Sequence, residues 1–274
     1  MKRYIILLVI SLFACVERDT GDPEVPEEPE VSYEFPCNCD EWPFEAYNLP
    51  DELPWNFPII LGSDEWNQLQ SVEERYNACQ MTVEIFPSLS TTDLAAICMQ
   101  YPMYFVAIVN RPYENGLDTL LKYSNGHREL FKREDVLNGL LNWYGWAIDN
   151  IPYILTEECP IDERLFLHWG IATMELLLSR YQSTDIEDYF MIMKCLYYGY
   201  QKTLLYPEQF GIPKYSMVTN TNLYSRVKTM LKIDEQIIDQ IPQKEQNQLF
   251  YKIEHDDQTR QIIDDLSCQF INNH

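Results

Sequence analysis

Histidine is the side chain best suited to proton transfer at neutral pH, and this chain has four. His168 stands directly before Trp169 in the most apolar stretch, and Glu175 follows seven residues later, on roughly the same face of a helix. One interpretation is an acid/base centre that pairs His168 with Glu163, Glu175 or Cys159. The alternative, which we favour, is a histidine in the core or in a groove that makes one hydrogen bond.

Other arrangements that would carry catalysis or bind a metal are missing from the sequence. The zinc-binding pattern HExxH, the EF-hand calcium loop and the Gly-rich phosphate-binding loops do not occur. Cys159-Pro160, just before a long helix, is the only candidate for a Cys/His hydrolase. The pair Asp264-Asp265 is expected on a solvated face, because acidic residues are so frequent. The sequence therefore predicts no cofactor, no metal site and no identifiable catalytic residue.

The chain has eight cysteines, and seven remain when Cys15 is set aside. Most of these seven fall on apolar helix faces, where a free cysteine behaves as a small hydrophobic side chain. Buried free thiols are the favoured interpretation. A disulfide between Cys79 and Cys98 is the alternative, because the short helices that carry them are separated by a turn at Phe86-Pro87 and would lie antiparallel.

The first 15 residues resemble the signal of a bacterial lipoprotein. Two basic residues precede an apolar run over 4–13, which is too short to cross a bilayer, since that takes about 20 apolar residues. Ala14 then stands directly before Cys15, as in the lipobox that signal peptidase II cleaves. The resemblance implies removal of residues 1–14 and a lipid with palmitate-type acyl chains on Cys15. An ordinary signal peptide, with an incidental Cys15, is the alternative.

Residues 15–32 predict an acidic tether that holds the following domain away from the membrane. Prolines at 23, 26 and 29 favour polyproline II, and the like charges between them extend the chain further. The acidic residues after Cys15 also resemble the signal that directs Bacteroidota-type lipoproteins to the cell surface; a periplasmic spacer is the alternative. We expect a protein of the cell envelope that is lipid-anchored to the outer membrane.

The strong negative charge restricts the kinds of partner. The formal net charge is −23, and loss of Lys2 and Arg3 with the signal would make it −25. Binding to nucleic acid or to anionic headgroups depends on Lys and Arg, so the sequence excludes nucleic acid and argues against a basic membrane-binding patch. Attachment to the membrane must come from the acyl chains, and more than one chain is needed for stable anchoring.

Residues 33–66 alternate prolines with aromatic residues, and this pattern predicts an extended arm. Dense proline forbids a long helix and holds the preceding residues in extended conformations. We favour an arm pinned by its aromatic side chains against a helical body, because aromatic residues in folded chains are usually packed. An aromatic platform for sugar rings or for peptide is the alternative.

From about Ser71 the apolar residues recur with the period of an α-helix. Ser71 and Ser90, each followed by an acidic residue three positions on, are typical helix starts. Further helices are expected at 103–109, 127–132, 136–148, 161–181, 186–205, 221–231 and 245–270, with Asn125-Gly126 as a turn and 161–181 as the central helix. Glycines at 139, 145, 170 and 199 fall inside these helices, so close approach of neighbouring elements is expected there.

The sequence thus predicts an all-α domain over 67–274, an irregular multi-helix array that is either α-solenoid-like or an orthogonal bundle, preceded by the arm. Residues 72–144 resemble uncharacterised helical lipoproteins of Bacteroidota, and that resemblance implies no activity. The expected function is binding or scaffolding in the cell envelope, with a protein or a glycan as partner. The alternative is an envelope hydrolase with its active site in a helical groove near His168.

Overall fold

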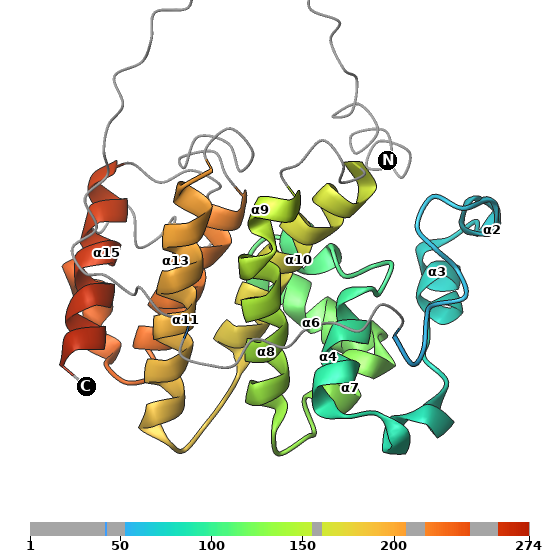
Figure 1. Ribbon diagram of the computed structural model, residues 1–274, viewed down its shortest axis with the longest axis horizontal. Helices are drawn as coiled ribbons and strands as arrows, with labels where there is room; N and C mark the ends of the chain where they lie inside the picture. Colours follow the sequence, from blue (N-terminus) through green and yellow to red (C-terminus); the bar gives the residue numbers. More distant parts are fainter. Residues whose placement is uncertain (1–41, 43–52, 155–160, 207–216, 242–256, 274) are drawn as a thin grey trace, which may run out of the picture. The chain divides into compact units, whose positions relative to one another are not determined.

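The computed structural model describes residues 42, 53–154, 161–206, 217–241 and 257–273, all of which belong to one compact unit, Phe35–His274. Every secondary-structure element in these ranges is a helix, which confirms the all-α multi-helix array (Figure 1). Ala14, Cys15, the acidic tether, most of the arm and Cys159 lie outside the described residues. Within the described ranges, no helix combines the length and the apolar character that crossing a membrane requires.

The first four helices of the described residues are α2 (Asp64–Gln68), α3 (Val72–Ala78), the 3-10 helix η1 (Val83–Ser88) and α4 (Thr91–Met99). Two of them, α3 and α4, begin where hydroxyl caps predict them. The Ser71 side chain accepts a hydrogen bond from the Glu74 amide, and the Glu74 carboxylate accepts one from the Ser71 amide, which forms a complete capping box. Ser90 caps α4 through the Asp93 amide. Both predicted helix starts are therefore confirmed.

One predicted turn is instead the beginning of a helix. After α5 (Val106–Val109) and α6 (Tyr113–Tyr123) comes α7 (Asn125–Leu130), so Asn125-Gly126 lies in its first turn. The Ser124 hydroxyl caps this helix by accepting a hydrogen bond from the His127 amide. An added Cβ on Gly126 would lie 2.5 Å from the Met81 Sδ. The glycine therefore serves close packing here, and the expectation of a turn was wrong.

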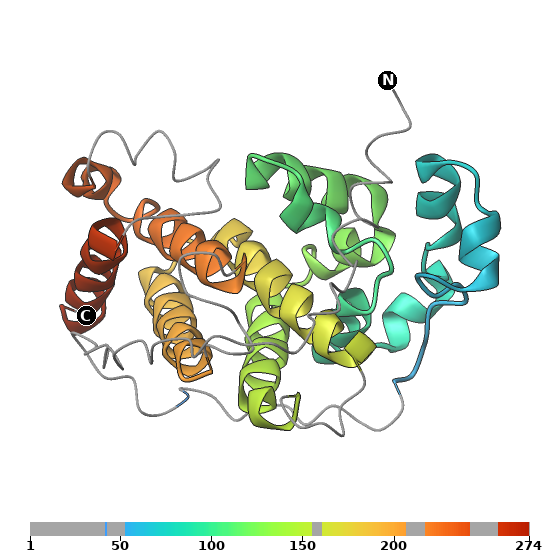
Figure 2. The ribbon, with the colours of Figure 1, turned by 90° about the horizontal axis from the view of Figure 1, so that it is seen from above.

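Five longer helices pack against one another in the rest of the unit. They are α8 (Val136–Asp149), α10 (Ile161–Arg180), α11 (Ile186–Leu204), α13 (Met217–Met230) and α15 (Asp257–Asn272), with the short α9 (Ile151–Ile154) after α8 and the 3-10 helix η2 (Glu235–Gln240) after α13. α10 packs against α8 and α13, α11 packs against the same two helices, and α15 covers α11 and α13 (Figures 1 and 2). The predicted central position of α10 is confirmed.

Close approach at the helical glycines is also confirmed. A Cβ at Gly139, Gly170 or Gly199 would collide with a neighbouring side chain. At Gly145 the neighbour is Trp42 of the proline- and aromatic-rich arm, whose indole would lie 2.5 Å from an added Cβ. The same indole packs against Tyr198, with ring centroids 5.4 Å apart. At Trp42, therefore, the arm is held by an aromatic side chain against α8 and α11, as the sequence predicts.

We expect the effect of Gly145→Ala to depend on Trp42. In the wild-type chain the added methyl group collides with the indole, so the substitution lowers the free energy of unfolding or displaces the arm. In a Trp42→Ala background the collision is gone, and alanine stabilises the helix by up to about 1 kcal/mol through its higher propensity. Urea denaturation of the four chains measures the difference. Equal effects in both backgrounds would contradict the contact.

Candidate functional site

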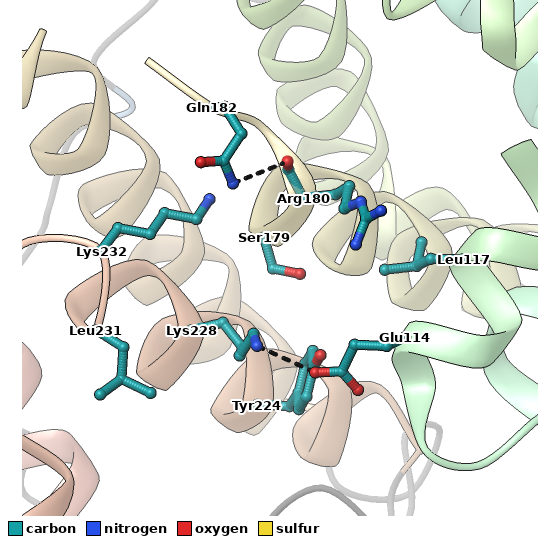
Figure 3. A pocket seen from close by; sticks show the side chains of 9 residues that line it. All are labelled: Glu114, Leu117, Ser179, Arg180, Gln182, Tyr224, Lys228, Leu231 and Lys232. Carbon is teal, nitrogen blue, oxygen red and sulfur yellow. Dashed lines mark hydrogen bonds and ion pairs between the residues drawn. The ribbon is translucent and has the colours of Figure 1, made fainter. Parts of the chain in front are cut away.

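The candidate functional site is a pocket where α6, the end of α10 and α13 meet (Figure 3). Its volume is about 230 Å³. Three cations face it, although the chain has 43 acidic and only 20 basic residues. The lining consists of Arg180, Lys228 and Lys232, with Glu114, Leu117, Ser179, Gln182, Tyr224 and Leu231 between them. We call it the cationic pocket.

The spacing of residues on α13 places two of the cations and a tyrosine in line. Tyr224 and Lys228 are four residues apart, so they share one face of the helix. Lys232 lies four residues further on, in the turn that ends α13, where its amide donates to the Thr229 carbonyl at 3.2 Å. Arg180 comes from the last turn of α10 and Glu114 from the first turn of α6. Three helix ends therefore supply the charged groups.

Two of the three cations have acidic partners. The Lys228 Nζ lies 3.0 Å from the Glu114 Oε1, and the Arg180 Nη2 lies 2.9 Å from the Asp118 Oδ1. Burial alone would raise the pKa of Glu114, but hydrogen bonds from Tyr224, the backbone and Lys228 outweigh it and lower this pKa. Glu114 is therefore ionised at neutral pH, and it stays bound to its cation.

Lys232 differs from the other two because its partners are neutral. Its ammonium group donates to the Tyr181 carbonyl and lies 5.2 Å from the centroid of the Tyr189 ring. Burial, together with the nearby charges of Lys228 and Arg180, lowers the pKa of Lys232 to about 8. At neutral pH the pocket therefore contains a positive charge that no carboxylate of the described residues balances. Such a site attracts an anion.

Glu175, one of the three groups considered as a partner of His168, belongs to a separate buried network. Glu175 is fully buried, and its two carboxylate oxygens are held by Tyr144, Thr221 and Asn222. Burial lowers the pKa of His168 to about 4, so the ring is neutral at neutral pH. Glu175 thus serves a structural network, whereas Cys159 and the side chain of Glu163 lie outside the described part of the structure.

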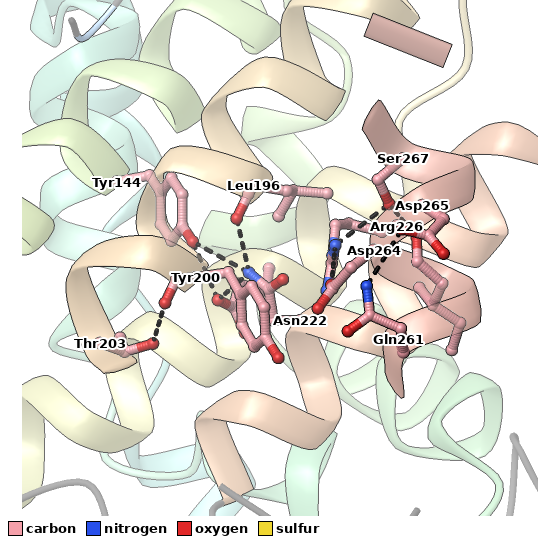
Figure 4. Close-up of polar contacts among 12 residues, drawn as sticks. Tyr144, Leu196, Tyr200, Thr203, Asn222, Arg226, Gln261, Asp264, Asp265 and Ser267 are labelled. Carbon is pink, nitrogen blue, oxygen red and sulfur yellow. Dashed lines mark hydrogen bonds and ion pairs between the residues drawn. The ribbon is translucent and has the colours of Figure 1, made fainter. Parts of the chain in front are cut away.

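The network around Glu175 joins four helices, and Figure 4 labels Tyr144, Leu196 and Asn222 among its members. From α8, the Tyr144 hydroxyl donates to the Glu175 Oε1 at 2.9 Å. From α13, the Thr221 hydroxyl donates to the Oε2 at 2.6 Å and the Asn222 amide donates to the Oε1 at 2.8 Å. The Asn222 amide also donates to the Leu196 carbonyl of α11. Burial raises the pKa of Glu175 to about 7, although these hydrogen bonds and Arg226 lower it.

A second buried network corrects the expectation for Asp264. Its carboxylate Oδ1 lies 2.8 Å from the Arg226 Nη1, and both side chains are 0% exposed. The guanidinium group also lies over the Tyr200 ring, 4.4 Å from its centroid, and donates to the Ser267 hydroxyl (Figure 4). Asp264 therefore does not belong to a solvated face. The adjacent Asp265, which accepts from Gln261, is partly exposed.

The cysteines of the described residues are buried and reduced. Cys79, Cys98, Cys195 and Cys268 are all thiols, so the alternative of a Cys79–Cys98 disulfide is not present in the structure. Burial raises the pKa of Cys79 to about 11 and raises that of Cys98 further. These thiols are therefore protonated and unreactive at neutral pH. Within the described ranges, no group of three or more His, Cys, Asp or Glu side chains could hold a metal ion.

Sequence reasoning missed the cationic pocket, although one local signal for it exists. Tyr224, Lys228 and Lys232 recur every fourth residue in a chain that is poor in basic residues. The other cation, Arg180, joins them only through the packing of α10 against α13. Comparison of the whole chain with protein-family models, with curated proteins and with solved structures finds no match in any of the three.

Proposed function

We propose that this chain is an exported lipoprotein that works as a binding or scaffolding component of the bacterial cell envelope. Its lipid on Cys15 anchors it to the outer membrane, and its helical unit binds a protein or a glycan. The observation that carries the binding function is the cationic pocket, where Arg180, Lys228 and Lys232 converge in a chain of net charge −23. Three basic side chains gathered against the overall charge favour binding of an acidic group.

The same geometry favours binding over hydrolysis. General acid/base catalysis needs two titratable groups within reach of a substrate. In the cationic pocket Glu114 is committed to Lys228, and the buried Glu175 is committed to its network. Hydrolysis by the purified protein across glycan and peptide panels tests the alternative. Turnover that disappears on His168→Ala would support a hydrolase and contradict a pure binding function.

Measuring membrane attachment tests the proposed lipid anchor on Cys15. We expect Cys15→Ala to move the protein from the membrane fraction to the soluble fraction, because the thiol that carries the acyl chains is gone. Cys37→Ala is the matched control, since it removes a cysteine outside the lipobox and leaves the protein in the membrane fraction. Immunoblotting of the two fractions measures both. A Cys15→Ala variant that stays with the membrane would contradict lipid anchoring at this residue.

A further inference from the structure

We propose that the cationic pocket binds the carboxylate of a sugar acid, a monosaccharide unit with one negative charge and several hydroxyl groups. This inference rests on the proposed binding function and names the class of ligand for its site. Three properties of the pocket carry it: the balance of charges, the polar groups beside those charges, and the volume.

The charge balance favours a ligand with a single negative charge. Arg180, Lys228 and Lys232 contribute three positive charges, while Glu114 and Asp118 each neutralise one of them at 3.0 and 2.9 Å. Among the described residues one positive charge remains, and a carboxylate would balance it. A phosphate monoester carries up to two negative charges and would exceed it. The net charge of −23 repels anions from most of the chain, so an anion is expected to bind where the local charge is positive.

The remaining charge resides on Lys232, which holds a fixed position. The hydrogen bond to the Tyr181 carbonyl and the contact with the Tyr189 ring orient its ammonium group, and Figure 3 shows this group beside Gln182 and Ser179 at the pocket. An ammonium has three donors, so one bond to a carbonyl leaves others for a carboxylate. Binding of a carboxylate would also offset the repulsion from Lys228 and Arg180.

The other lining groups suit sugar hydroxyls and the faces of a sugar ring. The Ser179 hydroxyl donates its hydrogen to the Leu176 carbonyl at 2.7 Å, so its oxygen is available as an acceptor. The Gln182 carboxamide lies on the exposed side of the pocket and provides both a donor and an acceptor. Leu117 and Leu231 form the apolar part of the wall. Polar groups at fixed positions within an apolar wall are typical of small-ligand sites.

The volume limits the ligand to one small unit. Pockets that take drug-sized molecules measure about 300–1,000 Å³, and this one measures about 230 Å³. A single sugar acid, free or at the end of a longer glycan, fits this limit better than an extended chain.

Titration of the full-length chain in detergent, followed by NMR of the added ligand, tests the ligand class. We expect glucuronate to bind more tightly than acetate, glucose or inorganic phosphate, because only glucuronate combines a single carboxylate with hydroxyl groups. If acetate bound as tightly as glucuronate, the claim that the pocket recognises the sugar hydroxyls would be overturned. Phosphate or glucose binding more tightly than glucuronate, or no binding of glucuronate, would overturn it entirely.

Substitutions of single charges test the site. We expect Lys232→Gln to weaken glucuronate binding roughly tenfold or more, and Lys232→Arg, which keeps the charge, to retain binding. Lys132→Gln removes an exposed positive charge outside the pocket and is the matched control. Asp118→Asn frees Arg180 and should tighten binding, a gain that no folding defect can produce. Equal affinities for Lys232→Gln and Lys132→Gln, or no gain with Asp118→Asn, would overturn the proposal.

The pH dependence of binding gives an independent readout. Besides Lys232, the described residues place the following charged and titratable groups around the pocket: Glu114 and Asp118 of α6, Arg180 and Tyr181 at the end of α10, Asp188 and Tyr189 of α11, and Tyr224 and Lys228 of α13. Lys232 is the cation whose pKa is lowered to about 8, so affinity should fall as the pH rises above 8, by at most tenfold per unit. Affinity independent of pH between 7 and 10 would contradict a role for Lys232.

The outcomes separate the two proposals. Loss of membrane attachment in Cys15→Ala, without glucuronate binding by the wild-type chain, would leave the envelope lipoprotein standing and remove the sugar-acid ligand. Glucuronate binding by a chain that keeps residues 1–14 and stays in the cytoplasm would remove the envelope lipoprotein and leave the sugar-acid ligand standing.

Discussion

Replacing Asp264 by Asn is expected to lower the free energy of unfolding by about 3–5 kcal/mol, because it leaves the buried charge of Arg226 without its counter-ion. Both side chains are 0% exposed, and 2.8 Å separates the paired atoms. Burial alone would lower the pKa of Arg226, but Asp264 and the tyrosines beside it outweigh that effect and raise it. The guanidinium therefore stays charged in the variant. Urea denaturation followed by circular dichroism measures the loss.

The neighbouring Asp265→Asn variant is the matched control. It makes the same chemical change one residue away, on a partly exposed side chain, and should change stability by no more than about 0.5 kcal/mol. A double variant, Arg226→Met with Asp264→Leu, removes both charges and should recover much of the lost stability. If Asp264→Asn were as stable as Asp265→Asn, the buried ion pair would not join α13 to α15 as described.

Glu175→Gln is expected to remove a pH dependence of stability. The pKa of Glu175 is about 7 in the folded chain and about 4.5 when unperturbed, so between these values the folded state keeps a proton that the unfolded state has released. Stability therefore falls as the pH rises from 4.5 to 7, by on the order of 3 kcal/mol from this group. Glutamine resembles the protonated acid, so the variant should lack this fall and be the more stable chain at pH 8.

The network can accept the glutamine amide. The Thr221 hydroxyl lies 3.0 Å from the Val218 carbonyl, so it can donate there and accept from the new amide. Tyr144 and Asn222 continue to donate to the remaining oxygen. Glu84→Gln, on an exposed side chain, is the matched control and should keep the wild-type pH dependence. Urea denaturation at pH 5, 6, 7 and 8 makes the comparison. An unchanged slope in Glu175→Gln would contradict the burial of a protonated carboxyl group.

Local patterns predicted most of the helices. The capping sequences at Ser71 and Ser90 have the expected hydrogen bonds, and the apolar periodicity of 136–148 and 186–205 matches α8 and α11 within one residue at each end. These features depend on residues within one or two turns of each other, which is the range that periodicity can detect. The helix predicted from residue 221 begins instead at Met217, since tertiary packing extends it through polar residues.

Contacts between distant residues could not be predicted in this way. Polar residues of α13 such as Asn222 and Arg226 are fully buried, although their types alone suggest a solvated face. Arg226 pairs with Asp264, which lies 38 residues further along the chain. Glu175 accepts a hydrogen bond from Thr221, which lies 46 residues further along. No local spacing encodes such pairs. The same holds for the cationic pocket, where only the four-residue spacing on α13 was visible in advance.

The titration of the Lys232 ammonium group, followed by NMR of its labelled side chain, tests most directly that the cationic pocket holds an unbalanced positive charge ready for an anion. We predict a pKa of about 8 in the free protein, and a rise toward the ordinary value of 10.5 when glucuronate is added. The rise is expected because a bound carboxylate favours the charged amine. A pKa already near 10.5 in the free protein, with no response to the ligand, would contradict the account.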